Sequence, residues 1–591
     1  MKAFVLFTLF SLLNFSGPAV IQSADNTETE GLYTEDDNVE ILTVENFKEK
    51  VFGSKHAWLV EFYNAYCGFC RRFAPVWKEF TSDIVSWQDL VKVGVVDCNR
   101  DTNIPVCAEF EVYRYPTLIY FHEKYLNGTG RKLPPHDKEK IDDPKENRIK
   151  LADALIQEQL EGRGTIYPNL LHYNYSDSSK LFEVPRQPKY VFLVVIPTNS
   201  TIGVELAMYY HQVPEIAIRY TYDNNTKLFN ALNVRTTPSL FVVERDGSFK
   251  VLTVYSSDTE GFRTAIERFL KSANINVRKV EPKKKTEISS ENKDKNDDKQ
   301  LLNEIKRKGD AVFQGDLESA LRYSLTREIG VQKEIKGKRL EALRLYLDVL
   351  EKYFPFGDNG KSLMKEIKEL AYKSDNVNGL DIRKKVLEAG KSEKKVFSTP
   401  QRWVGCIGST SAYRGYPCSL WKMFHFLTVN AALDNSFHFE HESVALRAMH
   451  GYIKNFFGCT ECSNHFQEMA SRRNIFDVST RKKAVLWLWE AHNEVNNRLH
   501  GDLTEDPEFL KNPFPYRNRC PQCQHPNGQW NEEEVYKYLT NMYNKDNINY
   551  LGSNKDALMT NSALSNKRIR RNVNLLLLAT AIYTFRGYVT L

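Results

Sequence analysis

Short apolar runs alternate with amphipathic segments along the first half of the chain, and a helix-like segment at 260–270 closes this part. Such alternation is typical of α/β domains, in which buried strands are covered by helices. The pattern predicts two α/β domains, at 39–160 and at 165–272. The strand-like runs lie at 58–64, 91–96, 117–121, 190–196, 216–220 and 239–243.

The two predicted domains are alike where a strand follows a proline. Tyr115-Pro116-Thr-Leu in the first domain matches Thr237-Pro238-Ser-Leu in the second. Of the two, only the first contains cysteines. An internal repeat is therefore expected, with a redox-active first copy and a redox-inactive second copy.

The second half of the chain follows a helical pattern. Residues 276–300 are polar, charged and almost devoid of aromatic side chains, which predicts a flexible linker. Apolar residues then recur at helical spacing, which predicts a helical spacer at 301–395 and a further helical domain at 399–543. The Asn- and Ser-rich stretch at 544–572 is expected to be a disordered tail.

At 591 residues the chain is too long for a single hydrophobic core. The patterns together predict a multidomain protein, in which two α/β domains precede an all-α spacer and an all-α helical bundle. The net charge of +6 is small for this length, and no basic cluster is interleaved with aromatic residues. Nucleic acid is therefore excluded as a partner.

Both ends of the chain carry segments that suggest targeting. Lys2 precedes an apolar run and then small residues, which predicts a secretory signal peptide over 1–24. Residues 573–591 are largely apolar but interrupted by Arg586, and the uninterrupted part is shorter than the roughly 20 residues that span a bilayer. A single-pass membrane anchor and a processed, soluble end both stay open. We expect the chain in the lumen of the ER or Golgi, or secreted. Four glycosylation sequons fit this location, at Asn127, Asn174, Asn199 and Asn224.

All ten cysteines have a close neighbour in the sequence. In an oxidising compartment this spacing favours five short-range disulfides. The pairs are Cys67/Cys70, Cys98/Cys107, Cys406/Cys418, Cys459/Cys462 and Cys520/Cys523.

The first of these pairs lies where a strand runs into a helix. Cys67-Gly-Phe-Cys70 directly follows the strand-like run at 58–64, so Cys67 is expected at a helix N-terminus. Unpaired N–H groups and the helix dipole stabilise a thiolate at such a position. Pro116 is expected as a cis proline beside this pair, and Glu61 as a buried proton acceptor for Cys70. A structural disulfide and half of a zinc site are the alternatives.

The segment from Val60 to Cys70, Val-Glu-Phe-Tyr-Asn-Ala-Tyr-Cys-Gly-Phe-Cys, resembles the active site of thioredoxin-fold proteins, above all that of protein disulfide isomerase domains. Phe69 stands where isomerases usually have a histidine. Tyr113 replaces the arginine usual three residues before the cis proline, with Arg114 next to it. The resemblance implies a redox-active thioredoxin-like domain, and the two departures change the groups available for proton transfer.

The second close pair, Cys459-Thr-Glu-Cys462, is followed by His465 in the helical half of the chain. Together with Cys520 and Cys523 it has the composition of a zinc site, although the two pairs lie far apart in sequence.

Aromatic, imidazole and amide side chains in the same region favour another interpretation, because they recur at spacings that share a helix face. Such groups bind a flat, hydrogen-bonding ring system; without further signals they more often form a core. The residues are Trp421, His425, Trp489, His492, Asn493 and Asn496.

Three motifs resemble the Erv/ALR flavin-dependent sulfhydryl oxidases, and the order of domains resembles that of the quiescin sulfhydryl oxidase family. The motifs are Arg414-Gly-Tyr-Pro-Cys418-Ser-Leu-Trp421, Cys459-x2-Cys462-x2-His465 and Trp489-x2-His492-Asn493. The resemblance implies that the spacer is a degenerate Erv-like unit and that FAD, rather than a metal, is the cofactor. The FAD contacts it implies are Arg414, Trp421, His425, Glu461, His465, Trp489, His492, Asn493, Val495, Asn496, Lys511 and Phe514.

The resemblance also implies a reaction, in which reduced or unfolded secretory proteins are oxidised and hydrogen peroxide is formed from oxygen. Electrons would pass from Cys67/Cys70 to Cys459/Cys462 and then to FAD, with Cys462 next to the flavin and Cys459 as the exchanging sulfur. Lys511 would lie near the flavin phosphates. The remaining pairs would be structural disulfides, Cys98/Cys107, Cys406/Cys418 and Cys520/Cys523.

Contact between the two dithiols requires the first domain to swing onto the last. The linker at 276–300 has an r.m.s. reach of roughly 28 Å, which allows this swing. Since the family pairs the spacer with the Erv-like domain within one chain, a monomer is expected. The alternatives are a flavin-free disulfide isomerase and a thioredoxin-like binding protein with zinc-stapled helices.

Overall fold

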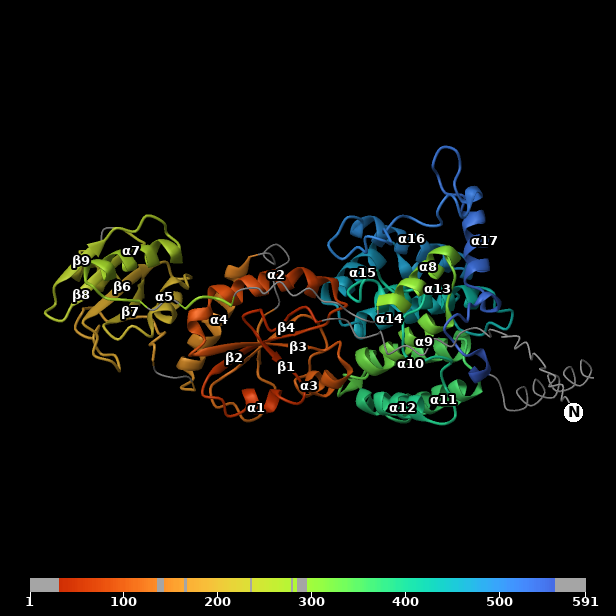
Figure 1. The fold of residues 1–591 in the computed structure, drawn as a ribbon, viewed down its shortest axis with the longest axis horizontal. Helices are drawn as coiled ribbons and strands as arrows, with labels where there is room; N and C mark the ends of the chain where they lie inside the picture. Colours follow the sequence, from red (N-terminus) through yellow and green to blue (C-terminus); the bar gives the residue numbers. More distant parts are fainter. Residues whose placement is uncertain are drawn as a thin grey trace, which may run out of the picture.

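The computed structural model describes residues 31–134, 143–163, 167–233, 236–277, 280–283 and 295–558. Figure 1 shows an elongated molecule in which the second α/β domain lies at one end, the first lies in the middle, and the helical half lies at the other end. This arrangement confirms the fold class predicted from the sequence.

The first α/β domain is built on a five-stranded sheet in the order β1-β3-β2-β4-β5. Its central strand, β2, is buried along its whole length, as its apolar sequence requires, and runs parallel to β3 and antiparallel to β4. The strands are β1 (Glu40–Leu42), β2 (Ala57–Tyr63), β3 (Val91–Asp97), β4 (Thr117–Phe121) and β5 (Arg131–Lys132). The helices are α1 (Phe47–Val51), α2 (Gly68–Asp83), α3 (Ile104–Glu109) and α4 (Pro144–Leu160).

The second α/β domain repeats this plan with four strands in the order β7-β6-β8-β9. Of its two inner strands, the one at 190–196 again runs parallel to one neighbour and antiparallel to the other. Pro238 forms a cis peptide bond before β8, as Pro116 does before β4. The strands are β6 (Tyr190–Ile196), β7 (Ile216–Tyr222), β8 (Ser239–Glu244) and β9 (Phe249–Leu252), and the helices are α5 (Ile202–Tyr210), α6 (Thr226–Ala231) and α7 (Thr259–Ser272).

The helical half has one continuous hydrophobic core, to which the spacer and the C-terminal bundle both contribute. Spacer helix α10 packs against bundle helix α14, where the rings of Tyr346 and Tyr452 lie 4.7 Å apart. Spacer elements are α8 (Lys295–Lys308), α9 (Gln314–Tyr323), the π-helix η4 (Ser324–Glu328), β10 (Ile335–Lys336), α10 (Lys338–Tyr353), α11 (Asp358–Lys373), β11 (Asn376–Val377) and α12 (Gly379–Lys391). Bundle helices are α13 (Gly415–Ala432), α14 (Val444–Asn455), α15 (Thr460–Arg472), α16 (Arg481–Leu499) and α17 (Glu532–Met542).

Two segments differ from the sequence-based expectation. Helix α8 begins at Lys295, inside the range expected to be linker. The chain at 544–558, expected to be disordered, lies along the spacer, because Asn549 exchanges backbone hydrogen bonds with Val312 (2.8 Å) and Gln314 (3.0 Å), and Ile548 is buried in the helical core. Short apolar side chains and backbone pairing order this stretch despite its polar composition.

The expected signal peptide at 1–24 and the apolar segment at 573–591 lie outside the described residues. Within the part of the chain that the structure describes, no helix has both the length and the apolar character needed to cross a membrane.

The first α/β domain is docked on the helical half, and polar contacts fix this position. The hydroxyl of Tyr323 accepts a hydrogen bond from Asn64 (2.9 Å) and donates one to Asn99 (2.8 Å). Trp403 donates a hydrogen bond to the hydroxyl of Tyr66 at 2.7 Å. These contacts place the first domain against the half of the chain that carries the second dithiol, and the swing of that domain stays a prediction.

Candidate functional site

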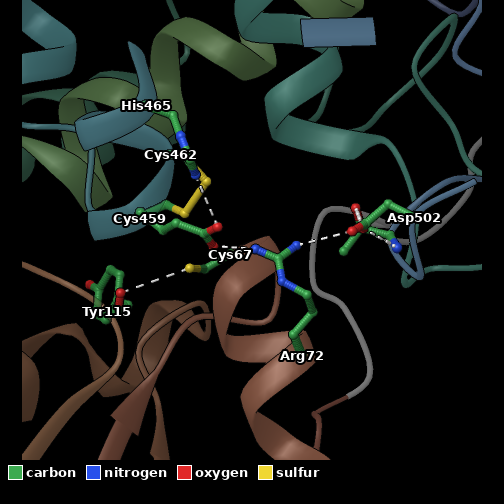
Figure 2. Close-up of polar contacts among 9 residues, drawn as sticks. Cys67, Arg72, Tyr115, Cys459, Cys462, His465 and Asp502 are labelled. Carbon is green, nitrogen blue, oxygen red and sulfur yellow. Dashed lines mark hydrogen bonds and ion pairs between the residues drawn. A yellow bond between two sulfur atoms is a disulfide. The ribbon is translucent and has the colours of Figure 1, made fainter. Parts of the chain in front are cut away.

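The two cysteine pairs expected to be redox-active meet at the boundary between the first α/β domain and the bundle. Cys67 is the residue that precedes α2, and Cys459 is the residue that precedes α15. Both are buried. Cys67 and Cys70 are free thiols, whereas Cys459 and Cys462 form a disulfide, and Figure 2 shows Cys67 facing that disulfide. We call Cys67, Tyr115, Cys459 and Cys462 the exchange site.

A short backbone pairing holds the exchange site together. Tyr115, which precedes the cis proline Pro116, forms an isolated parallel bridge with Cys459. The N–H of Tyr115 donates to the carbonyl of Gly458 at 2.8 Å, and the N–H of Thr460 donates to the carbonyl of Tyr115 at 3.4 Å. The sulfur of Cys67 lies 3.9 Å from that same carbonyl oxygen. The pairing therefore holds Cys459 opposite Cys67.

Charged side chains link the domains beside these sulfurs. Arg72 of α2 forms ion pairs with Glu461 of α15 and, at 3.4 Å, with Asp502 (Figure 2). The other carboxylate oxygen of Glu461 lies 3.2 Å from Nε2 of His465. On the far side of Cys459, Arg114 donates hydrogen bonds to backbone carbonyls of α14 and the loop that follows it.

Glu61 lies beneath the first cysteine pair, as the sequence predicted for a buried carboxylate. One of its oxygens accepts a hydrogen bond from Tyr33 at 2.5 Å, and the other has no partner among the described residues. Burial raises the pKa of Glu61 to about 8. Burial, the hydrogen bond to Cys67 and neighbouring charges that include Glu61 raise the pKa of Cys70 well above its usual range. A carboxylate with such a pKa is suited to exchange a proton with this thiol.

A cavity of about 990 Å³ opens next to the second cysteine pair. Cys462 lines it, whereas Cys459 does not. The size is near the upper end of the range for cofactor sites, roughly 300–1,000 Å³. Most of the expected FAD contacts line this cavity, namely Arg414, Trp421, Glu461, His465, His492, Val495, Asn496, Lys511 and Phe514.

The chemistry of the cavity wall fits a flavin dinucleotide. Trp421 and His492 present stacked rings, and Phe514 meets His492 edge-on with ring centroids 5.1 Å apart. Burial lowers the pKa of His492 to about 3, so its ring is neutral. Asn496 adds an amide, and Lys511 adds a cation for an anionic group. Flat apolar walls, hydrogen-bonding groups and a cation are what an isoalloxazine or adenine ring and a diphosphate require.

Three residues expected to contact FAD do not line the cavity and lie behind its wall. His425 is buried, with Nε2 3.1 Å from Nδ1 of His492. Trp489 donates a hydrogen bond to the carbonyl of Phe514 at 2.6 Å. Asn493 donates to the same carbonyl at 2.8 Å and accepts from the N–H of Phe514 at 3.0 Å. These side chains position the wall, and the helical spacing that suggested them does not distinguish the two roles.

Residues of the first α/β domain also line the cavity, although local sequence patterns indicate this only weakly. They are Tyr66, Gly68, Arg71 and Arg72. Their place depends on how the domain docks, which no local pattern encodes. The two arginines directly after Cys70 were the one available signal.

Three further disulfides join sequence neighbours, so four of the five expected pairs are bonded and Cys67/Cys70 is the exception. Because Cys459–Cys462 and Cys520–Cys523 are each closed within the pair, neither offers thiolates to a zinc ion. The three are Cys98–Cys107, Cys406–Cys418 and Cys520–Cys523.

Family models match three parts of the chain. The thioredoxin family matches residues 38–136, the flavin adenine dinucleotide (FAD)-dependent sulfhydryl oxidase family matches 308–409, and the Erv1/Alr family matches 418–515. The second match falls on the spacer, and the third covers Cys459, Cys462 and most of the cavity residues.

Relatives match nearly the whole chain. Sulfhydryl oxidase 1 of Mus musculus is 32% identical over 554 residues, which are 92% of this chain and 71% of that protein. Sulfhydryl oxidase 2 of Homo sapiens is 30% identical over 87% of this chain and 73% of that protein. Among solved structures, the sulfhydryl oxidase fragment of human QSOX1 is 36% identical over 41% of this chain and 98% of that fragment, with a TM-score of 0.37. The chain therefore belongs to the quiescin-type sulfhydryl oxidase family, and it is an FAD-dependent thiol oxidase.

Proposed function

We propose that this oxidase transfers electrons from the thiols of reduced secretory proteins through Cys67/Cys70 to Cys459/Cys462, and from there to the flavin. The observation that carries the proposal is the backbone pairing of Tyr115 with Cys459, which holds a free thiol of the first pair against the disulfide of the second. Cys462 lines the cavity and Cys459 does not, which supports Cys459 as the exchanging sulfur.

The first step oxidises the substrate. A substrate thiolate attacks the sulfur of Cys67 in the Cys67–Cys70 disulfide, and Cys70 leaves as a thiolate that takes a proton from Glu61. A second substrate thiolate then attacks the substrate sulfur of this mixed disulfide, and Cys67 leaves. Two substrate thiols become one disulfide, and the Cys67/Cys70 pair gains two electrons and becomes a dithiol.

The second step passes these electrons between domains. The Cys67 thiolate attacks Cys459, and Cys462 leaves as a thiolate facing the cavity. Cys70 gives its proton to Glu61 and attacks Cys67, so that Cys459 leaves and the first disulfide is restored. Because α2 and α15 begin next to these sulfurs, the N-terminal ends of both helices stabilise the negative charge that moves along the sulfurs.

FAD, when bound, supplies the electron acceptor for the Cys459/Cys462 dithiol and the reaction with oxygen that yields hydrogen peroxide. Arg414, Trp421, His492, Asn496 and Lys511 would hold it. Trp489 and Asn493 keep the Phe514 wall in place through the backbone of that residue.

Two features of the chain support secretory substrates, because both are typical of proteins in an oxidising compartment. Four disulfides join the described cysteines, and the four sequons at Asn127, Asn174, Asn199 and Asn224 are all exposed. The single core shared by the spacer and the bundle supports a monomer, because the spacer covers a face of α14 within the same chain.

Oxygen consumption tests the relay. Cys67→Ser is expected to abolish oxidation of a reduced protein while the yellow flavin stays bound, because the cavity does not include Cys67. A double variant, Cys70→Ser with Cys462→Ser, lacks both resolving thiols. With diamide added as the two-electron oxidant, it should accumulate a Cys67–Cys459 disulfide that peptide mass spectrometry detects. The relay is wrong if Cys67→Ser turns over protein thiols at the native rate, or if the double variant forms no interdomain disulfide.

A further inference from the structure

The docked thioredoxin-like domain forms part of the cavity wall. Tyr66 and Gly68 flank Cys67 in sequence, and Arg71 and Arg72 lie in the first turns of α2. These residues face the cavity together with residues of the bundle and of the spacer. The cavity that we assign to FAD is therefore complete only while the domain is docked.

Of the two arginines, Arg72 has its charge balanced by Glu461 and Asp502. Arg71 donates a hydrogen bond to the carbonyl of Ala412 at 2.7 Å, and its guanidinium lies 4.7 Å from the ring centroid of Tyr413. No carboxylate among the described residues forms an ion pair with Arg71. Burial lowers the pKa of Arg71, and nearby Asp502 raises it. Because Asp502 is ion-paired with Arg72, Arg71 lines the cavity without an ion pair of its own among the described residues.

Lys511 brings a second cation to the same space. Its ammonium donates to the carbonyl of Thr504 at 3.2 Å and has no ion-pair partner among the described residues. The nearby carboxylates are engaged elsewhere, Asp502 by Arg72 and Glu505 by the N–H groups of Gly501 and Lys511. Arg71 and Lys511 line the same cavity. Burial and the charge of Arg71 lower the pKa of Lys511, whereas Glu505, Asp502 and Asp506 raise it.

Two neighbouring cations from different domains repel each other unless an anion lies between them. The cofactor of this enzyme carries such an anion in its diphosphate, and guanidinium groups bind phosphate oxygens through charge-assisted hydrogen bonds. We propose that Arg71 of the docked thioredoxin-like domain binds the diphosphate of FAD together with Lys511. The inference rests on the proposed relay, which requires the same docked arrangement.

The consequence is a reciprocal coupling between docking and cofactor retention. If Arg71 contacts FAD only in the docked state, docking strengthens FAD binding, and bound FAD favours docking by the same factor. A role of Arg71 in docking alone, through Ala412 and Tyr413, would produce no such contact. The test must therefore hold the docked state fixed while it removes the guanidinium.

The Cys67–Cys459 disulfide of the Cys70→Ser, Cys462→Ser protein provides this fixed state. Arg71→Ala and, as a control, Arg114→Ala are introduced into the full-length trapped protein. Arg114 also bridges the two domains, but it does not line the cavity. FAD release after dilution into cofactor-free buffer is followed by the rise in flavin fluorescence, and circular dichroism checks that each variant is folded.

Arg71→Ala is expected to speed FAD release about tenfold, which corresponds to the loss of one charge-assisted hydrogen bond, and Arg114→Ala by less than about twofold. Arg71→Lys should lie between the native and alanine proteins, because it keeps the charge without the planar fork. A trapped protein whose FAD release is unchanged by Arg71→Ala and Arg71→Lys would overturn the inference and leave the relay intact. Failure to form the trapped disulfide would overturn the relay and this inference with it.

Discussion

The carboxyl group beneath the first cysteine pair sets the pH dependence of electron transfer. Cys70 attacks Cys67 only as a thiolate, yet burial raises the pKa of Cys70 well above its usual range. Glu61 is the group placed to take that proton, and its own pKa is about 8. Glu61→Gln keeps the shape and the hydrogen bond with Tyr33 but removes the base.

The magnitude follows from the ionised fraction of Glu61. With a pKa of about 8, roughly a tenth of the carboxyl groups are ionised at pH 7 and roughly nine tenths at pH 9. The resolving step of the native enzyme should therefore accelerate about ninefold over this range. Loss of a general base costs about 100-fold or more in rate, so the variant should be slow and should lack the inflection near pH 8.

Stopped-flow absorbance measures this step. Oxidised enzyme is mixed without oxygen with saturating dithiothreitol between pH 6 and 9, and loss of the flavin absorbance reports arrival of electrons. Glu49→Gln, at an exposed position on α1, serves as the control for a lost charge. A Glu61→Gln enzyme with the native rate and the native pH profile would refute the assignment of Glu61 as the base.

The raised pKa of Glu61 also makes the free energy of unfolding depend on pH. Because its pKa is higher in the folded protein than the usual 4.5, Glu61 favours the folded state fully below pH 4.5 and loses that contribution as the pH rises through 8. The difference corresponds to about 5 kcal/mol. Urea unfolding of the full-length native protein should therefore need less urea at pH 9 than at pH 5, and Glu61→Gln should reduce that difference.

Two further predictions concern the helical half and the docked state. Glu328 of η4 is buried and accepts a hydrogen bond from the N–H of Gly458 at 2.7 Å, and burial raises its pKa to about 8. Its contribution to folding is therefore present below pH 4.5 and lost as the pH rises through 8, so Glu328→Gln should reduce the loss of urea resistance between pH 5 and pH 9; an unchanged loss in that variant would contradict the reasoning. Arg72→Ala removes the partly exposed ion pair with Glu461, worth about 0.5–1 kcal/mol, so electron transfer should slow about two- to fivefold at low salt, with a difference that shrinks at high salt. An undiminished difference at high salt would argue against an electrostatic role.

Local sequence patterns predicted the fold and the reacting atoms but could not predict their assembly. The strand that runs into Cys67, the cis proline at Pro116 and the motif around Cys459 are encoded within a few residues, so each was recognised. The contact between Tyr115 and Cys459, and the place of Arg71 in the cavity wall, depend on two surfaces far apart in the sequence. Helical spacing likewise marked Trp489 and Asn493 without showing that they hold the backbone of Phe514 rather than face the cavity.

The pairing between Tyr115 and the segment from Gly458 to Thr460 also limits the order of events. The N–H and carbonyl groups of Tyr115 are occupied by that segment. An extended client polypeptide that approached Cys67 along the same backbone edge would compete directly with the enzyme's own bundle. In each round of catalysis, the client polypeptide and the bundle must then bind the same backbone edge in turn. A large excess of reduced client should therefore slow turnover by keeping the bundle away from Cys67.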